Sequence, residues 1–413
     1  MNLDLIRQAS WLDAARAWRF TVVFAAISLI ATAWDFIAHT THGVMDETGE
    51  QLARDFINYW AGARLAIEGR AAMAYDTSAY HAFQRELIGA LSEFRMYSYP
   101  PTAMLLSLPL AALGFVPALA LWTLGGLAWT AALLSRVIGR KLGILAAVAA
   151  PAAFVNTISG QNGAFSAGFL CGGLMLLERR PVLAGILFGC LCYKPQIGVL
   201  LPVALAAGGY WRTFLATGAT ALLLVGVSTA WLGLDAWAGL AHQSVMQRGL
   251  LELGYTLWHR MPTSFATARA LGASVPVAYA VQILSGGLAA AAVAIVWRGG
   301  ATMPVKASVL VTATFLATPY AWDYDLVATV FVVAWLAGEA ARTAFRPWEK
   351  IGLAALVAMP LVLGPIAEAT RLQIGPIVLW AVLVLATRRA LDPAMSLSPR
   401  LPASSPGPSG ASR

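Results

Sequence analysis

The residues best suited to chemistry stand in one polar stretch of an otherwise apolar 413-residue sequence, ARDFINYWAGARLAIEGRAAMAYD, residues 53 to 76. A carboxylate such as Asp55 can take the proton from a hydroxyl group, while nearby cations stabilise a phosphate that departs. The cations that could meet such a phosphate are Lys194, His259 and Arg260. Asp55 equally suits the N-cap of a helix, so a structural and a catalytic role both stay open.

Two other polar pairs are candidates for binding. Gln161 and Asn162, in SGQNG, could bind sugar hydroxyls, but an amide pair at a helix start is as often a backbone cap. Asp323 and Asp325 could hold a divalent ion. Two carboxylates at i and i+2, with neither His nor further acids nearby, make a poor metal site. We therefore expect no metal ion and no other cofactor.

The composition is that of an integral membrane protein. Hydrophobic residues make up 59% of the chain and charged residues only 12%, against about 25% charged in soluble proteins. The run from Ser274 to Trp297 is apolar on every face, as a membrane-spanning helix must be. The net charge of +8 does not indicate a nucleic-acid partner, because the basic residues punctuate the gaps between apolar runs.

These short basic gaps predict which loops face the cytoplasm. We expect residues 18 to 38 to be an uncleaved first span that starts in the cytoplasm, and the later apolar runs to bring the count to about 11 to 12 spans. The loops then expected on the outside comprise residues 39 to 98, 156 to 162, 234 to 273, 318 to 325 and 368 to 373.

Two segments depart from simple crossings. The loop charges require an odd number of crossings over residues 99 to 135, so YPPTAMLLSLPLAAL should be partly re-entrant or lie along the surface, and Val116 to Ser135 should cross. Residues 181 to 209 have basic residues at both ends and YKPQ in the middle, which predicts a hairpin that enters and leaves on the cytoplasmic side.

The hairpin arms are too short to cross the bilayer. Each arm has about 13 residues, or about 20 Å of helix, against about 30 Å of hydrocarbon. Lys194 is therefore expected below the outer surface, in a wet, protein-lined cavity open to the outside. Alternatively, its long side chain reaches upward to the interface.

The element that must position Asp55 is a short helix. The spacing of apolar residues over 57 to 68 predicts an amphipathic helix at the membrane interface, ended at Gly69, with Asp55 at or just before its start. Tyr59 and Trp60 would then lie in the headgroup layer, where amphipathic rings are stabilised.

Five motifs in order carry a resemblance: DFINYWAGARLAIEG followed by AYD, then YPPTAMLLSLPLA, SGQNGAF, YKPQIGVLLPVAL and TPYAWDYDL. Over residues 50 to 330 the chain resembles glycosyltransferase family 87, a family of polytopic GT-C enzymes that includes mycobacterial polyprenyl-phosphate-mannose-dependent mannosyltransferases. The resemblance implies an all-α polytopic membrane fold with a long first extracytoplasmic loop. It also implies a polyprenyl-phosphate hexose as donor, used at the outer face of the bacterial inner membrane.

The resemblance also implies roles for particular residues. Asp55 would be the general base of an inverting transfer, Lys194 would begin the family's Lys-Pro-Gln motif, and the polyprenyl phosphate would leave toward Lys194 and Arg260. Mycobacterial members carry a Trp followed by a His pair near the TP motif, where this chain has AWDYD, so the resemblance does not fix mannose as the sugar. Candidates for binding the sugar or a lipid or glycan acceptor are Tyr59, Arg64, Gln161, Asn162, Gln196, Asp323 and Asp325.

We expect one membrane domain over residues 1 to 390 and a disordered cytoplasmic tail over 391 to 413, which is rich in Pro, Ser and Gly. A transporter or flippase of a lipid-linked sugar is the alternative function, and it favours internal repeats with broken helices in matching positions. A polysaccharide polymerase or ligase favours a large outer loop late in the chain. The sequence has no convincing repeat and its long loop comes first, so an enzyme acting among membrane lipids is favoured.

Overall fold

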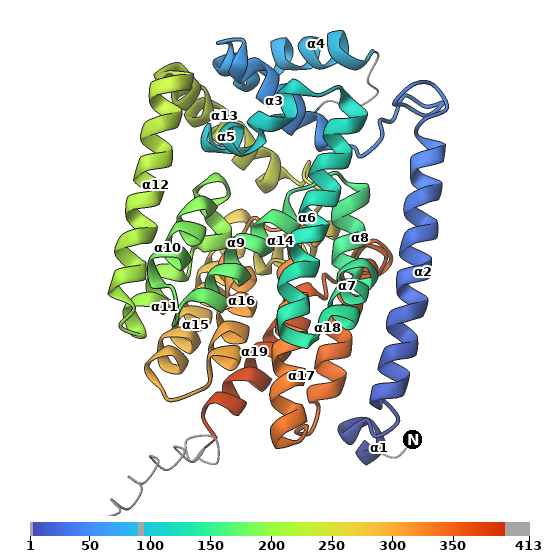
Figure 1. The fold of residues 1–413 in the computed structure, drawn as a ribbon, viewed down its shortest axis with the longest axis vertical. Helices are drawn as coiled ribbons and strands as arrows, with labels where there is room; N and C mark the ends of the chain where they lie inside the picture. Colours follow the sequence, from blue (N-terminus) through green and yellow to red (C-terminus); the bar gives the residue numbers. More distant parts are fainter. Residues whose placement is uncertain (1–2, 90–94, 393–413) are drawn as a thin grey trace, which may run out of the picture.

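The computed structural model describes residues 3–89 and 95–392, which are almost entirely helical and contain no β-strand. The all-α prediction is therefore confirmed. The helices run up and down between two ends of the molecule, with the N-terminus at one of them (Figure 1). The predicted disordered tail falls largely on residues 393–413, outside the described residues.

Long apolar helices identify the chain as a multi-pass membrane protein. In the described part of the chain, six helical segments are long and apolar enough to cross a membrane: α2 (Ala14–Ala38), α6 (Phe115–Ile138), α12 (Trp211–Leu232), α15 (Val275–Arg298), the segment Asp323–Thr343 and α18 (Glu349–Thr370). There are seven if α7 (Arg140–Ala149) and α8 (Pro151–Ile158), which meet at 55°, form one span. The expected count of 11 to 12 stays a prediction, because the other apolar helices are shorter.

The shorter helices fill the interior of the bundle. They include α9 (Gly163–Leu176), α16 (Met303–Ala317) and α19 (Gly375–Ala390). By contrast, only 11% of the apolar window of α2 or of α12 is buried, and both stand at the periphery in Figure 1. Large side chains such as Trp34 and Leu222 are more than 70% exposed there, as expected for surfaces that face lipid.

The connections alternate between the two ends as the loop charges predict. The loops after α6, α15 and α17 (Thr329–Thr343) lie toward the N-terminal end, together with the end of α19 (Figure 1). The opposite end carries α3 (Phe56–Ile67), α4 (Thr77–Ile88) and α13 (Leu234–Leu253) (Figure 1). Which side of the membrane each end faces stays a prediction.

Helix α3 has the predicted bounds but a different environment. It starts directly after Asp55 and ends before Gly69, whose φ of +70° suits glycine. Ten of its twelve residues are buried, and Tyr59 and Trp60 are only 1% and 4% exposed, so the predicted interfacial position of these two rings is wrong. The helix is buried because three neighbouring segments pack against it: η1 (Ala71–Tyr75), α5 (Thr102–Ser107) and η2 (Leu108–Ala112).

The two unusual segments follow the sequence prediction in outline. Residues 102–112 form short helices beside α3, and α6 then supplies one long helix. The hairpin consists of α10 (Pro181–Cys190), η3 (Leu191–Tyr193), η4 (Pro195–Gly198) and α11 (Leu201–Ala207), with Lys194 at its turn. The Thr213 hydroxyl at the start of α12 donates to the Pro181 carbonyl at 3.0 Å, so both ends of the hairpin lie at the same level.

Two elements late in the chain complete the surroundings of the candidate site. The 3-10 helix η6 (Asp323–Ala328) is buried throughout and packs against α8 and α9. The 3-10 turn η5 (Trp258–Arg260) and helix α14 (Ser264–Ala270) follow α13. They bring residues from the second half of the chain to the turn between α8 and α9.

Candidate active site

The turn between α8 and α9, residues 159–162, joins most of the predicted site residues. The Asp55 backbone N–H donates to the Ser159 carbonyl at 3.2 Å, and the Arg260 Nη2 lies 3.5 Å from the Ser159 hydroxyl. The Gln161 and Asn162 side chains contact Asp55 and Lys194 respectively. One four-residue turn therefore contacts the candidate base and two of the three candidate cations, Lys194 and Arg260.

Two glycines allow other segments to approach this turn closely. Gly160 has φ +59°, and a Cβ there would lie 2.4 Å from the Ala53 carbonyl oxygen. A Cβ on Gly163 would lie 2.0 Å from the Tyr324 carbonyl oxygen, and the Gly163 N–H donates to Asn156 Oδ1. The absence of side chains at both positions lets the start of α3 and η6 pack closely against the turn.

The Asp55 carboxylate is held by two donors. Arg95 Nη1 donates to Oδ1 at 3.0 Å, and Gln161 Nε2 donates to Oδ2 at 2.8 Å. Asp55 occupies the N-cap position of α3, but its side chain makes no capping hydrogen bond, so the capping interpretation of this side chain is wrong. The side chain is 24% exposed, and a carboxylate oxygen that accepts one hydrogen bond keeps a lone pair for another.

Gln161 is itself oriented by two phenols. The hydroxyls of Tyr59 and Tyr99 lie 2.6 Å and 3.0 Å from its Oε1. Burial raises the pKa of both tyrosines well above the ordinary value, so each stays a neutral hydroxyl donor. Because Oε1 accepts from them, the Gln161 amide group turns its N–H toward Asp55, as a positioning residue would.

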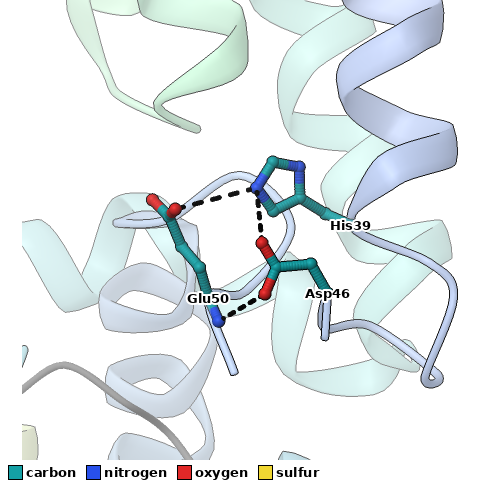
Figure 2. A group of neighbouring side chains, drawn as sticks. All are labelled: His39, Asp46 and Glu50. Atoms are coloured by element: carbon teal, nitrogen blue, oxygen red, sulfur yellow. Dashed lines mark hydrogen bonds and ion pairs between the residues drawn. The ribbon is translucent and has the colours of Figure 1, made fainter. Parts of the chain in front are cut away.

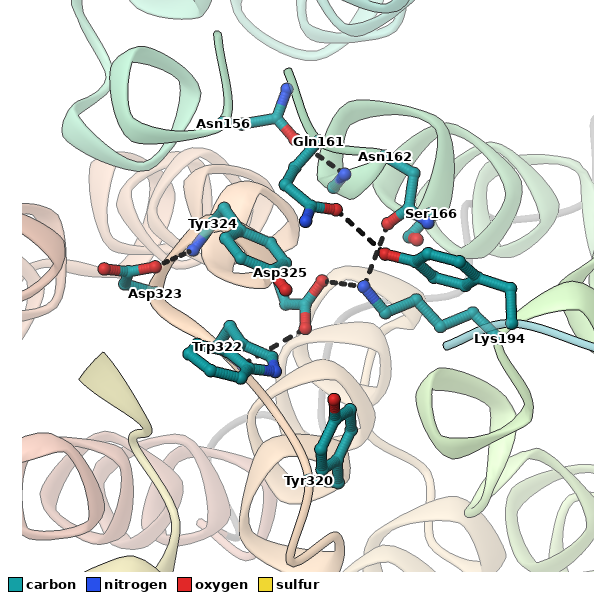
Figure 3. Close-up of polar contacts among 12 residues, drawn as sticks. Asn156, Gln161, Asn162, Ser166, Lys194, Tyr320, Trp322, Asp323, Tyr324 and Asp325 are labelled. Carbon is teal, nitrogen blue, oxygen red and sulfur yellow. Dashed lines mark hydrogen bonds and ion pairs between the residues drawn. The ribbon is translucent and has the colours of Figure 1, made fainter. Parts of the chain in front are cut away.

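Lys194 forms a buried ion pair. Its Nζ lies 2.5 Å from Asp325 Oδ1 and 2.9 Å from Asn162 Oδ1 (Figure 3), and Lys194 is only 2% exposed. The ring of Tyr324 lies 5.1 Å from the ammonium, close enough for a cation–π interaction. The predicted wet cavity around Lys194, and the alternative of a side chain reaching to the interface, are both wrong, because Asp325 neutralises the charge inside the protein.

Arg260 pairs with the other carboxylate of η6. Its Nε and Nη2 donate to Asp323 at 2.7 and 2.9 Å, a two-point contact that fixes the plane of the guanidinium. Burial opposes the charge of Arg260, but the hydrogen bonds and negative charge of Asp323 outweigh it and raise the Arg260 pKa. Asp323 and Asp325 thus pair with different cations (Figure 3 shows them pointing apart).

Uncommitted donors remain in this part of the molecule. Asn162 Nδ2 and Trp322 Nε1 are buried and make no hydrogen bond within the described residues. Buried polar groups are nearly always hydrogen-bonded in folded proteins, so unpaired donors indicate a position for a ligand or water. The predicted helix-capping role of Asn162 is not observed, because its side chain makes no capping bond to α9.

Three predicted site residues, His259, Arg64 and Gln196, make no described contact with the group around Asp55. His259 Nε2 lies 3.2 Å from Glu368, so its only ion pair within the described residues is with α18 and not with the group around Asp55. Arg64 stacks over the Trp60 ring at 5.2 Å and lines a separate surface cavity, because it occupies a different face of α3 from Asp55 and Tyr59. Gln196 is half-buried in η4, two residues beyond Lys194.

The residues missed from sequence are Arg95, Tyr99 and Ser159. Arg95 and Tyr99 lie in the irregular segment between α4 and α5, where no periodicity marks a direction. One sequence signal for Arg95 was available: basic residues concentrate in cytoplasmic loops, whereas Arg95 lies in a loop predicted to be outside. Tyr99 stands in the YPP motif and Ser159 opens SGQNG, so both belonged to motifs already recognised.

Comparison with known proteins agrees with the motif pattern. The sequence model of glycosyltransferase family 87 matches residues 97–319, more than half of the chain. The matched region contains Tyr99, the 159–162 turn, Lys194 and Arg260, while Asp325 lies shortly after its end and Asp55 lies well before its start. No curated protein and no solved structure matched the chain.

Proposed function

The chain belongs to glycosyltransferase family 87, and from this we propose that it moves a hexose from a polyprenyl-phosphate sugar to a lipid or glycan acceptor at the outer face of the bacterial inner membrane. Mannose is one candidate hexose. The observation that carries the proposal is the environment of Asp55. This carboxylate is partly exposed, oriented by two donors, and joined through one turn to Lys194 and Arg260.

Asp55 acts as the general base. One oxygen of the Asp55 carboxylate takes the proton of the acceptor hydroxyl. In the same step, the oxygen of that acceptor hydroxyl attacks the anomeric carbon of the donor sugar. The bond from the anomeric carbon to the phosphate oxygen breaks in the same step, and its electron pair stays on the polyprenyl phosphate. A single displacement of this kind inverts the configuration, and it requires one base and no covalent sugar intermediate.

Arg260 is better placed than Lys194 to contact the departing phosphate. Its side chain is 25% exposed, whereas that of Lys194 is 2% exposed and contacts two acceptors. Within the described residues Arg260 Nη1 makes no hydrogen bond, so two N–H groups are available for phosphate oxygens. Lys194 then acts chiefly by holding Asp325 and Asn162 in place, and the amide of Asn162 is available to a sugar hydroxyl.

The donor class and the transporter alternative can be tested in one assay. Membranes of a deletion strain, which supply the native acceptor, are given wild-type protein, Asp55→Asn or no protein, with either radiolabelled polyprenyl-phosphate hexose or the nucleotide hexose. We expect label to reach a new product only from the polyprenyl-phosphate donor. Asp55→Asn should lower that rate by about 10²- to 10⁴-fold, the range of general-base contributions.

Transfer directly from the nucleotide sugar would contradict the proposed donor. Unchanged product formation by Asp55→Asn would contradict the proposed base. A transporter would instead leave the donor chemically intact in every arm of the assay. The amount and melting temperature of each purified variant serve as the folding control.

A further inference from the structure

We propose that His39, Asp46 and Glu50 form a binding site for a divalent cation of the zinc class, where the first span ends and the first outer loop begins (Figure 2). None of these residues belongs to the group around Asp55. The proposal does not depend on the chemistry that the protein performs, and its test measures metal binding rather than transfer.

The three side chains converge on one point. His39 Nε2 lies 3.7 Å from Asp46 Oδ2 and 3.9 Å from Glu50 Oε2, and the three ligand atoms lie within 4.8 Å of one another. Zinc bonds of about 2.1 Å in tetrahedral geometry place ligand atoms about 3.4 Å apart. His39 Nε2 is therefore within about 0.5 Å of the required separation from each carboxylate oxygen, and small side-chain rotations of Asp46 and Glu50 would bring the two oxygens together around an ion.

The orientation of His39 is the independent indication of a cation. The residue is only 8% exposed, and its Nδ1 lies 2.8 Å from the Asp35 carbonyl oxygen. Nδ1 must therefore carry a proton and donate it, which in the neutral ring leaves a lone pair on Nε2. Within the described residues Nε2 makes no hydrogen bond and faces two carboxylates, an arrangement that a metal ion between them would stabilise.

Each carboxylate is held through its other oxygen. Asp46 Oδ1 accepts from the backbone N–H and hydroxyl of Thr48 and from the Glu50 N–H, at 2.7 to 2.9 Å. Glu50 Oε1 accepts from Arg54 Nε at 2.6 Å. Such outer contacts orient metal ligands in proteins, and here they leave Asp46 Oδ2 and Glu50 Oε2 directed at His39.

The donor set decides the class of ion. One imidazole nitrogen and two carboxylate oxygens suit Zn²⁺ or a similar transition metal, whereas Ca²⁺ and Mg²⁺ prefer oxygen ligands alone. Two carboxylates balance the two positive charges of the ion. Three protein ligands leave the fourth tetrahedral position for water.

The ion would stabilise the approach to the candidate base. It would tie the end of α2 to the segment that leads into α3, where Ala53 and Arg54 have φ values of 54° and 31°. Non-glycine residues rarely adopt such backbone angles unless their surroundings hold them there. The role assigned to the ion is structural, with no part in sugar transfer.

The test uses the full-length protein, purified without a polyhistidine tag and stripped with a chelator. Calorimetric titration with Zn²⁺, elemental analysis after dialysis, and melting temperature with and without Zn²⁺ are measured for the wild type, His39→Gln and Asp46→Asn. The matched control is His42→Gln, a nearby exposed histidine.

We expect about one tightly bound Zn²⁺ per chain and a rise of several degrees in melting temperature for the wild type and His42→Gln. His39→Gln and Asp46→Asn should bind about 100-fold more weakly and show no such rise, since loss of an outer contact alone weakens binding 10- to 100-fold. Equal binding by the wild type and His39→Gln, or no Zn²⁺ binding by the wild type, would overturn the proposal.

Discussion

At the scale of single residues, the group around Asp55 pairs its charges one to one. Arg95 contacts Asp55, Arg260 contacts Asp323, and Lys194 contacts Asp325. Only the last pair is wholly buried, with side chains 2% and 0% exposed. A buried charge without its partner is far more unfavourable than an exposed one, so the Lys194 pair has the largest effect on folding.

This pair gives the first prediction. Lys194→Met leaves Asp325 buried without a cation, and Asp325→Leu leaves the lysine without an anion, so each should destabilise the protein by about 3–5 kcal/mol. The double variant removes both charges and should recover most of that loss. Melting temperatures of the purified proteins would show it. Two single variants as stable as the wild type would mean that the ion pair is not formed.

Residue types and motif order predicted most of this group, but not its internal contacts. Gln161 was a candidate for binding the sugar or acceptor, and in the structure it also orients Asp55, a role that depends on two tyrosines from other segments. Arg64 lies nine residues, or two and a half helical turns, after Asp55, so its place on another face of α3 follows from the helical period once the helix is recognised. Arg95 was missed because an irregular segment gives no period from which to infer direction.

At the scale of elements, the site depends on the close approach of three segments to the 159–162 turn. The start of α3 packs over Gly160, η6 packs over Gly163, and the turn of the α10–α11 hairpin brings Lys194 beside Asn162. None of these elements provides the site alone. Substitutions that separate them should therefore reduce activity without touching a charged residue.

Gly163→Ala tests this dependence. The added Cβ would lie 2.0 Å from the Tyr324 carbonyl, a backbone atom that moves only if η6 moves. We expect a lower melting temperature and loss of most transfer activity in the membrane assay. Gly218→Ala is the matched control, because Gly218 lies within α12 with nothing within 4 Å of the added methyl group, and it should behave as the wild type or slightly better. Equal activity of the two variants would contradict the close packing.

Element bounds were more predictable than element surroundings. The end of α3 follows from a local signal, Gly69, which acts within a few residues, whereas Asp55 marks the start of the helix without capping it through its side chain. Its burial depends on η1, α5 and η2, whose packing no local pattern encodes. The same holds for Lys194, whose position at the hairpin turn was predictable from arm length, whereas its partner Asp325 lies 131 residues away.

At the scale of the whole molecule, apolar runs and basic loops predicted a polytopic fold whose connections alternate between two ends. The lengths of individual helices were less predictable, because helices buried inside a bundle need not match the thickness of the bilayer. Short interior helices such as α9 and α16 are predicted spans by charge pattern, but they are shorter than the six helical segments long enough to cross a membrane among the described residues.

The predicted orientation can be tested with single cysteines in a variant whose three native cysteines are replaced by alanine. Glu47→Cys, in the loop after α2, should react with a membrane-impermeant maleimide in intact spheroplasts. Gly300→Cys, between α15 and α16, should react only after the membrane is opened, because that loop is predicted to be cytoplasmic. The reverse labelling pattern would place the candidate site on the cytoplasmic side.

The most direct test of the central claim is a single-turnover transfer rate for the purified protein with polyprenyl-phosphate hexose prebound and acceptor added last. The account predicts that Asp55→Asn binds the donor as the wild type does, and that its transfer step is slower by about 10²- to 10⁴-fold. A transfer step within about tenfold of the wild-type rate, with donor binding intact, would contradict Asp55 as the base.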